Sequence, residues 1–171
     1  MKGFAPRTSK RGSFLARPWL KRVLPRRFLT VPICLVFLAC SNAAPVDEPG
    51  TSPDAALETY RTLLGARALT DESRILTPDS RALLQRGYSG GQQSREGSVL
   101  SRAMDQAQTV VDGDRAVIVF PTSNEASPYF LRRGAEGWQV DLASMARYIG
   151  FDAQNHWYFR STGHPYSFAF E

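Results

Sequence analysis

The sequence predicts an α+β domain in which N-terminal helices pack on an antiparallel sheet and are followed by a C-terminal helix and an aromatic hairpin. Two observations indicate this class. Apolar residues recur at a helical spacing of three and four before residue 87, whereas the spacing approaches two after residue 107. Short links that contain Gly separate the later segments, as in hairpins. Helices followed by a meander of strands define the α+β class.

Three helical segments are expected ahead of the sheet. The first begins at Ser52-Pro53, because Ser caps helix N-termini and Pro is favoured at the first helical position. Its apolar stripe consists of Leu57, Tyr60, Leu63 and Leu64. A short helical stretch is expected over residues 71–76, and a third helix opens at Thr77-Pro78 and ends near Gly87. Residues 87–98 are rich in Gly and Ser, which predicts a loop.

Four strands are expected next, over residues 107–111, 115–120, 128–133 and 138–142. The links DGD and GAEG suit tight hairpins, so the strands should pair as an antiparallel meander. A helix is expected over residues 143–149. The aromatic tail, residues 156–171, is expected to form two strands around STGHP, with most of its rings in the core.

The first 39 residues have the features of a signal peptide. Nine of the 21 Lys and Arg residues lie within residues 1–40, and the first acidic residue is Asp47. The apolar run from Phe28 to Ala39 is shorter than the roughly 20 residues that span a bilayer. A run of this length behind a positive segment is typical of the core of a secretion signal.

The end of that run, FLAC, resembles the lipobox of bacterial lipoprotein signal peptides. The resemblance implies that Cys40 is acylated and becomes the N-terminus, with Phe37 in place of the usual Leu. Residues 40–53 then form a lipidated cysteine and a flexible tether, and residues 54–171 form a single domain. The resemblance implies a membrane partner through the lipid, with Ser41 favouring the outer membrane facing the periplasm. The alternative is cleavage at the SNA that follows the cysteine, which would give a soluble periplasmic protein.

Charge and cysteine content exclude several classes of function. After the leader, 12 basic and 16 acidic side chains remain, so the mature chain is acidic and nucleic acid is not an expected partner. The two cysteines are Cys34, in the leader, and Cys40, so the domain has no disulfide and no thiolate ligand. His156 and His164 are too few for a three-histidine zinc site, and neither a metal nor a cofactor is expected.

The order of segments resembles the nuclear-transport-factor-2-like superfamily, which includes polyketide-cyclase-like and isomerase-like proteins. The residues that carry the resemblance are ALETYRTLL, DGDRAVIVF and GAEGWQVDL, within residues 54–142. The resemblance implies a cystatin-like, cone-shaped domain in which the helices pack on a curved sheet whose concave side can hold a pocket. It does not account for residues 143–171.

Asp141 is the one candidate for catalysis. It alternates with Val140 and Leu142 along a strand, so it points away from them. The resemblance implies a possible general base on such a strand. The segment after Asp141 is helical in pattern, however, which makes the carboxylate a helix cap, and we expect this structural role.

Four residues are candidates for binding: Tyr129, Arg132, Trp138 and Arg160. An Arg guanidinium beside aromatic faces suits the recognition of anionic or sugar-like groups, or of a protein surface. We therefore expect a non-enzymatic envelope lipoprotein that binds a small apolar ligand or a protein partner. The alternatives are a small-pocket enzyme of the polyketide-cyclase-like or isomerase-like type, and an inhibitor or immunity lipoprotein that blocks a wall-directed hydrolase.

The lipid anchor is tested at Cys40. Cys40→Ala removes the thiol that would be acylated, so the protein should leave the membrane fraction for the soluble periplasm or stay unprocessed. Fractionation and the mass of the mature chain measure this, and Cys34→Ala, within the leader, serves as the matched control. Unchanged fractionation and mass for Cys40→Ala would contradict the anchor.

Overall fold

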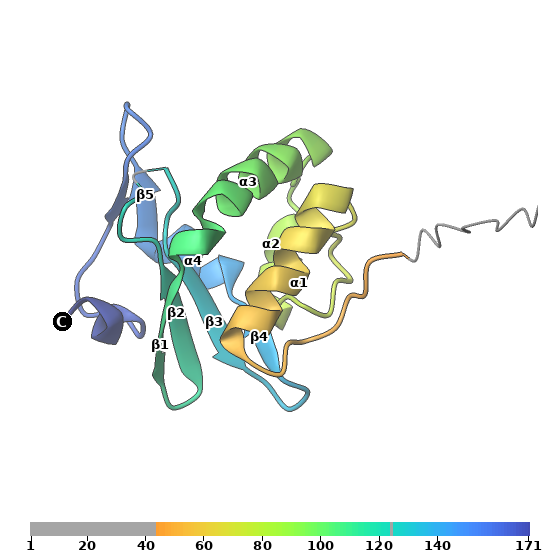
Figure 1. Ribbon diagram of the computed structural model, residues 1–171, viewed down its shortest axis with the longest axis horizontal. Coiled ribbons are helices and arrows are strands. Elements are labelled where there is room, and N and C mark those ends of the chain that lie inside the picture. The colour runs from red at the N-terminus through yellow and green to blue at the C-terminus, as the bar shows by residue number, and fades with distance from the viewer. Residues whose placement is uncertain (1–43, 124) are drawn as a thin grey trace, which may run out of the picture. The chain divides into compact units, whose positions relative to one another are not determined.

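The computed structural model describes residues 44–123 and 125–171, and Cys40 and the leader lie outside these ranges. The described residues form an α+β domain, as predicted (Figure 1). Its helices are α1 (Pro53–Ala66), α2 (Pro78–Leu84), α3 (Gly90–Ala103) and α4 (Leu142–Tyr148), with 3-10 turns η1 (Met104–Gln106) and η2 (Ser167–Phe170). Its strands are β1 (Gln108–Asp112), β2 (Arg115–Val119), β3 (Tyr129–Arg133), β4 (Trp138–Val140), β5 (Ile149–Phe151) and β6 (Trp157–Phe159).

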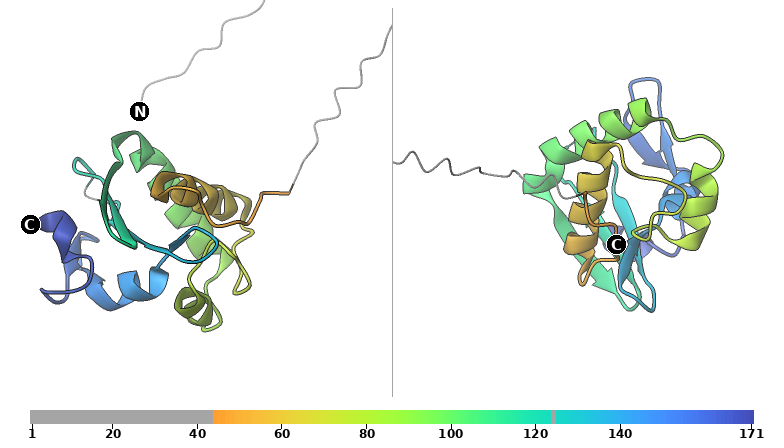
Figure 2. Two further views of the ribbon diagram at one scale, coloured as in Figure 1. Left: turned by 90° about the horizontal axis from the view of Figure 1, so that it is seen from below. Right: turned by 90° about the vertical axis from the view of Figure 1, so that its right-hand side faces the viewer.

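The main sheet is the predicted antiparallel meander, in the order β1-β2-β3-β4. Val117 of β2 pairs with Val110 on one side and with Phe130 on the other, which fixes the register. Gly113 takes a positive φ of 59° in the turn between β1 and β2, a conformation that a side chain would disfavour. The sheet is curved, and α1 and α3 lie on its concave side (Figure 2).

Alternation along β2 gives the sheet two buried faces. Ala116 and Ile118 belong to the core beneath the helices, together with Leu57, Tyr60 and Leu100. Val117, between them, points the other way and packs with residues of the C-terminal segment. All three β2 side chains are fully buried, so the strand needs a covering layer on each side.

The C-terminal segment supplies the second layer. The ring of Tyr166 stacks on that of Phe130 of β3, with centroids 4.3 Å apart and an interplanar angle of 8°. Ile149 of β5 completes this smaller core. Residues after α4, which the resemblance did not account for, therefore supply the layer on the outer face of the sheet.

Three predictions about local structure were wrong. Residues 87–98 are not a loop, because α3 begins at Gly90 with a capping box between Ser89 and Gln92. Gly97 lowers helix propensity but lets α3 approach α1, since an added Cβ would lie 3.1 Å from the Cβ of Leu64. This close packing outweighs the local preference for a loop.

Residues 71–76 form turns where the sequence predicted a helix. The backbone groups of this segment are bonded to β4, with Val140 N–H donating to Ile75 O at 2.8 Å. The expected second aromatic strand is also absent from the described tail, where η2 takes its place. Ser167 N–H donates to His164 O at 3.0 Å, and Pro165 has no N–H to give to a strand partner.

Part of the segment that was expected as a tether, residues 47–50, packs on the domain. Gly50 forms a reciprocal pair of backbone hydrogen bonds with Trp138 of β4, at 2.8 and 2.9 Å. Asp47 Oδ1 accepts a hydrogen bond from Ile75 N–H at 3.0 Å. The edge of β4 is thus partly covered by residues that composition alone describes as linker.

The close approach at Gly50 yields a prediction. A Cβ at this position would lie 2.3 Å from the backbone nitrogen of Ala56, so Gly50→Ala forces the backbone apart and should destabilise the domain by about 1–3 kcal/mol. Gly65→Ala is the matched control. Gly65 lies in α1 with nothing within 4 Å of an added Cβ, so there the change should stabilise by about 0.5–1 kcal/mol. Urea unfolding measures both, and a neutral Gly50→Ala would contradict the docking of residues 47–50.

Candidate functional site

The candidate site is a pocket of about 540 Å³ between α2, α3, α4 and the start of β3. Its apolar walls are formed by Leu83, Leu84, Val99, Leu100, Leu142 and Met145. The volume is in the usual range for small-molecule sites, about 300–1,000 Å³. The concave side of the sheet is therefore only partly filled by its own side chains.

Two carboxylates, those of Glu96 and Glu125, lie on the wall of this pocket, and Glu96 is the half-buried one. Glu96 comes from α3, directly beside the buried stripe that contains Gln93, Gly97 and Leu100. It is half-buried at the edge of that stripe, where the helix surface turns from core to pocket. The sequence did not predict α3, yet this helix positions Glu96. Among the described residues of the pocket, Glu96 is the acidic side chain that a network of hydrogen bonds holds in place.

Three tyrosine hydroxyls donate hydrogen bonds to Glu96. Tyr60 of α1 and Tyr129 of β3 both donate to Oε1, at 2.8 and 2.7 Å. Tyr88, from the segment before α3, donates to Oε2. A carboxylate accepts about four hydrogen bonds, so about one acceptor position remains, on Oε2. The network joins α1, α3 and β3 and fixes the direction in which that position points.

The tyrosines remain protonated donors. Burial, followed by the nearby Glu96 carboxylate, raises the pKa of Tyr60 and of Tyr129 well above the ordinary phenol value. The same causes raise the pKa of Tyr88. Glu96 itself has no ion-pair partner among the described residues, since their ion pairs involve other side chains. Its charge is therefore held by neutral groups alone.

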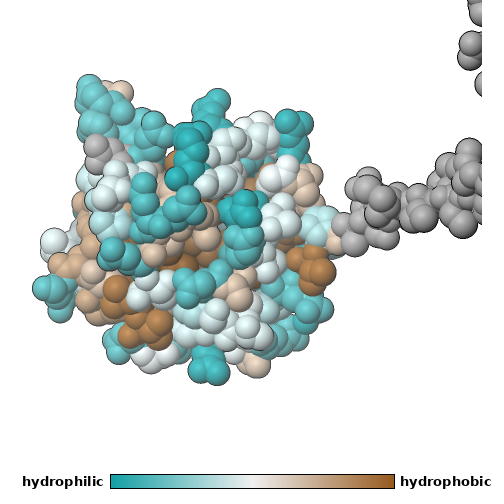
Figure 3. Space-filling view, in the orientation of Figure 1, coloured by the Kyte–Doolittle hydropathy of each residue, from teal (hydrophilic) through white to brown (hydrophobic). Residues whose placement is uncertain are grey.

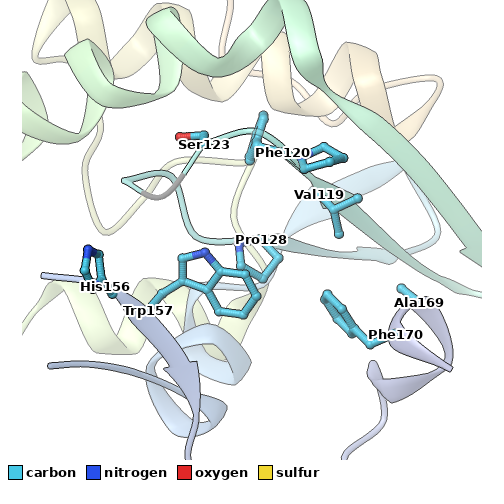
Figure 4. A pocket seen from close by; sticks show the side chains of 9 residues that line it. Val119, Phe120, Ser123, Pro128, His156, Trp157, Ala169 and Phe170 are labelled. Atoms are coloured by element: carbon cyan, nitrogen blue, oxygen red, sulfur yellow. The ribbon is translucent and has the colours of Figure 1, made fainter.

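A second cavity, of about 530 Å³, lies on the other side of the sheet. Figure 4 shows Trp157 of β6 and Phe170 of η2 across from Val119 and Pro128. Its polar side-chain groups are the Ser123 hydroxyl, the Trp157 indole N–H and the imidazole of the exposed His156, and none is tied into a network comparable to that of Glu96. This cavity offers aromatic surface without a fixed charged group.

Asp141 lines neither cavity and caps α4, as expected. Its Oδ1 accepts a hydrogen bond from Ser144 N–H at 3.0 Å. Its Oδ2 accepts from Ser144 Oγ at 2.7 Å and from the Tyr166 hydroxyl at 2.8 Å. The side chain is buried, and its oxygens are occupied by protein donors. The geometry gives Asp141 a structural role that ties α4 to the C-terminal segment.

The four expected binding residues do not come together. Tyr129 lines the pocket, whereas Trp138 is 5% exposed in the core and pairs with Gly50. Arg132 is exposed on β3 and lies opposite Arg115 of β2. Arg160 is exposed beyond β6, with its backbone N–H donating to Tyr148 O at 2.8 Å. Tyr129 is the member of this set that belongs to the candidate site.

Sequence reasoning missed Glu96, Tyr60 and Tyr88 as a site. Tyr60 was expected in the core, and a single Glu in a Gly-rich stretch carries no motif. The three donors stand 36, 8 and 33 residues from Glu96 along the chain, so only the tertiary fold joins them. The one local signal is S-x-x-Q at Ser89, a capping box that marks the start of α3.

One of the two histidines is buried in the outer core and the other is exposed. His164 is buried against the rings of Tyr148 and Phe159, and burial lowers the pKa of its imidazole. His156 is exposed beside Asp152, 3.5 Å away. Within residues 44–123 and 125–171, no three His, Cys, Asp or Glu side chains gather as a metal ion would require.

Comparison of the chain with known protein families, with curated proteins and with solved structures finds no match. In the part of the chain that the structure describes, none of the helices combines the length and apolar character needed to cross a membrane.

The cap at Asp141 makes a prediction about stability. Asp141→Ala removes the acceptor of Ser144 N–H and of the buried Tyr166 hydroxyl, and should cost about 1–3 kcal/mol. Asp141→Asn should cost less, because Asn also caps helices. Thermal melts compare the two, with Tyr166→Phe isolating the hydroxyl. Equal losses for Asn and Ala would contradict the capping role.

Proposed function

We propose that this chain is an envelope lipoprotein whose domain binds a small, largely apolar ligand in the pocket between α2, α3, α4 and β3, without transforming it. The observation that carries the proposal is a fixed carboxylate, Glu96, within apolar walls. Ligand sites typically combine apolar lining with a few oriented polar groups. The pocket has both components, and the groups that orient Glu96 come from three separate elements.

The apolar walls support binding of a hydrophobic body. Leu100 is fully buried and forms the inner part of the wall, whereas Val99, Leu142 and Met145 are half-buried and border the cavity. Burying apolar ligand surface against such walls contributes roughly 25 cal/mol per Å². A ligand that fills part of the cavity therefore gains most of its affinity from this contact.

The sequence of the leader supports the membrane anchor. Seven residue steps separate Cys40 from Asp47, the first residue seen bonded to the domain. Even fully extended, such a segment spans at most about 25 Å. An acylated Cys40 would hold the domain close to the membrane surface, where apolar molecules are concentrated.

The same carboxylate favours a second candidate function, proton transfer in an isomerase-like reaction. A carboxylate in a pocket beside hydroxyl donors is the arrangement that such chemistry uses, with Glu96 taking the place first expected for Asp141. Against this, three donors already occupy most of its acceptor positions. The pocket residues among the described part of the chain also include no histidine, lysine or cysteine as a proton-transfer partner.

Binding is tested with N-phenyl-1-naphthylamine, a neutral apolar fluorophore. We expect saturable, one-to-one enhancement of its fluorescence by the purified chain. Val99→Trp narrows the pocket and should weaken binding by about tenfold or more. Val111→Trp, at an exposed position of β1, is the matched control and should leave affinity unchanged. Figure 3 shows that some hydrophobic surface remains exposed on this side of the molecule. Equal affinities for the two variants would contradict the proposed site.

A further inference from the structure

We propose that the ligand of this pocket carries a protonated amine, which docks on the remaining acceptor position of Glu96. The inference rests on the proposed function, because it names the class of ligand that the same pocket takes. Three observations support it. The Glu96 carboxylate has no cationic partner among the described residues, one of its acceptor positions remains free, and aromatic side chains line the pocket beside it.

The Glu96 carboxylate has no cationic partner within the described residues. The phenol hydroxyls of Tyr60, Tyr88 and Tyr129 orient it but bring no positive charge. The other pocket carboxylate, Glu125, is paired with Arg102 at 2.7 Å. A half-buried, uncompensated negative charge therefore remains at Glu96, and it favours a cation over a neutral or anionic group.

The geometry requires a donor. Oε1 of Glu96 already accepts two hydrogen bonds and Oε2 accepts one. The remaining position can be filled by an N–H or O–H group, whereas a ligand carboxylate would meet a charge of its own sign. Both donors would make a charge-assisted hydrogen bond to the carboxylate, but an ammonium adds the attraction between opposite charges, so it is preferred over a hydroxyl.

Aromatic groups add to this preference. Tyr88 and Tyr129 line the pocket next to Glu96, and the ring of Tyr129 packs against those of Tyr60 and Phe120, 5.8 and 6.1 Å away. The faces of aromatic rings attract cations, whereas anions gain nothing from them. The walls around Glu96 are therefore compatible with an ammonium that also contacts phenol rings.

Two arginines, Arg86 and Arg95, also line the pocket, and both are exposed. Exposed charges are hydrated and are screened by salt over about 8 Å at physiological ionic strength. The half-buried Glu96 is screened less. Glu96 therefore decides which charge on a ligand is preferred, and the two exposed arginines contribute less to that preference.

The test compares three molecules of similar size, 2-phenylethylamine, 2-phenylethanol and 3-phenylpropanoate, by calorimetry with the purified full chain at pH 7. The amine should bind about tenfold tighter than the alcohol, and the acid should bind weakest. Glu96→Gln should reduce the affinity for the amine to that for the alcohol and change the latter by less than about threefold. Glu136→Gln, at an exposed carboxylate that is paired with Arg74 outside this pocket, is the matched control and should preserve the preference.

A second measurement covers the case in which Glu96→Gln fails to fold. In the unaltered chain, added salt should weaken binding of the amine and leave binding of the alcohol unchanged, because only the former depends on charge. Equal affinities for amine and alcohol, tightest binding of the acid, or salt-independent binding of the amine would each overturn the inference while leaving the pocket as a binding site. Failure to bind the amine, the alcohol and the neutral fluorophore would instead overturn the proposed function.

Discussion

The central strand β2 is buried on both faces, and the arrangement of the whole domain follows from this constraint. Ala116 and Ile118 are fully buried toward the helices, and Val117 is fully buried toward the C-terminal segment. A sheet whose central strand is apolar on both sides cannot leave either side in water. The helices α1 and α3 cover one face, and residues after α4 cover the other, as Figures 1 and 2 show.

The two layers border cavities of similar volume, about 530 and 540 Å³, but they differ in how their polar groups are held. On the outer face, the stacked rings of Phe130 and Tyr166 and the carboxylate of Asp141 form a packed unit with its polar groups satisfied. On the helix side, Glu96 stands at the border between core and cavity, held by tyrosines from α1, β3 and the segment before α3. The first arrangement stabilises the fold. The second holds a carboxylate on the wall of a pocket with an acceptor position left over, which is why we locate function there.

Periodicity and capping signals were enough to predict the α+β class, the start of α1 at Pro53, the meander from β1 to β4 and the cap at Asp141. They failed where tertiary contacts outweigh local preference. Gly97 disfavours a helix locally, yet it allows α3 to approach α1. The composition around Gly50 is that of a linker, but Gly50 packs against Ala56, which is possible only because it has no side chain. Glu96 could not be predicted as a site, because its three partners meet it only in the folded chain. Of the expected binding residues, Tyr129 alone lines the pocket. Trp138 is buried in the core, and Arg132 is exposed on β3.

The central claim is that the helix side of the sheet holds the open binding pocket, and methyl NMR of the full chain titrated with 2-phenylethanol tests it most directly. Leu100 and Leu142 report on this pocket, whereas Val119 and Ala169 report on the aromatic cavity of the outer face. If ligand enters the helix-side pocket, the methyl signals of Leu100 and Leu142 should shift saturably, and those of Val119 and Ala169 should stay unmoved. Shifts confined to Val119 and Ala169, or no saturable shifts at either pair, would contradict it.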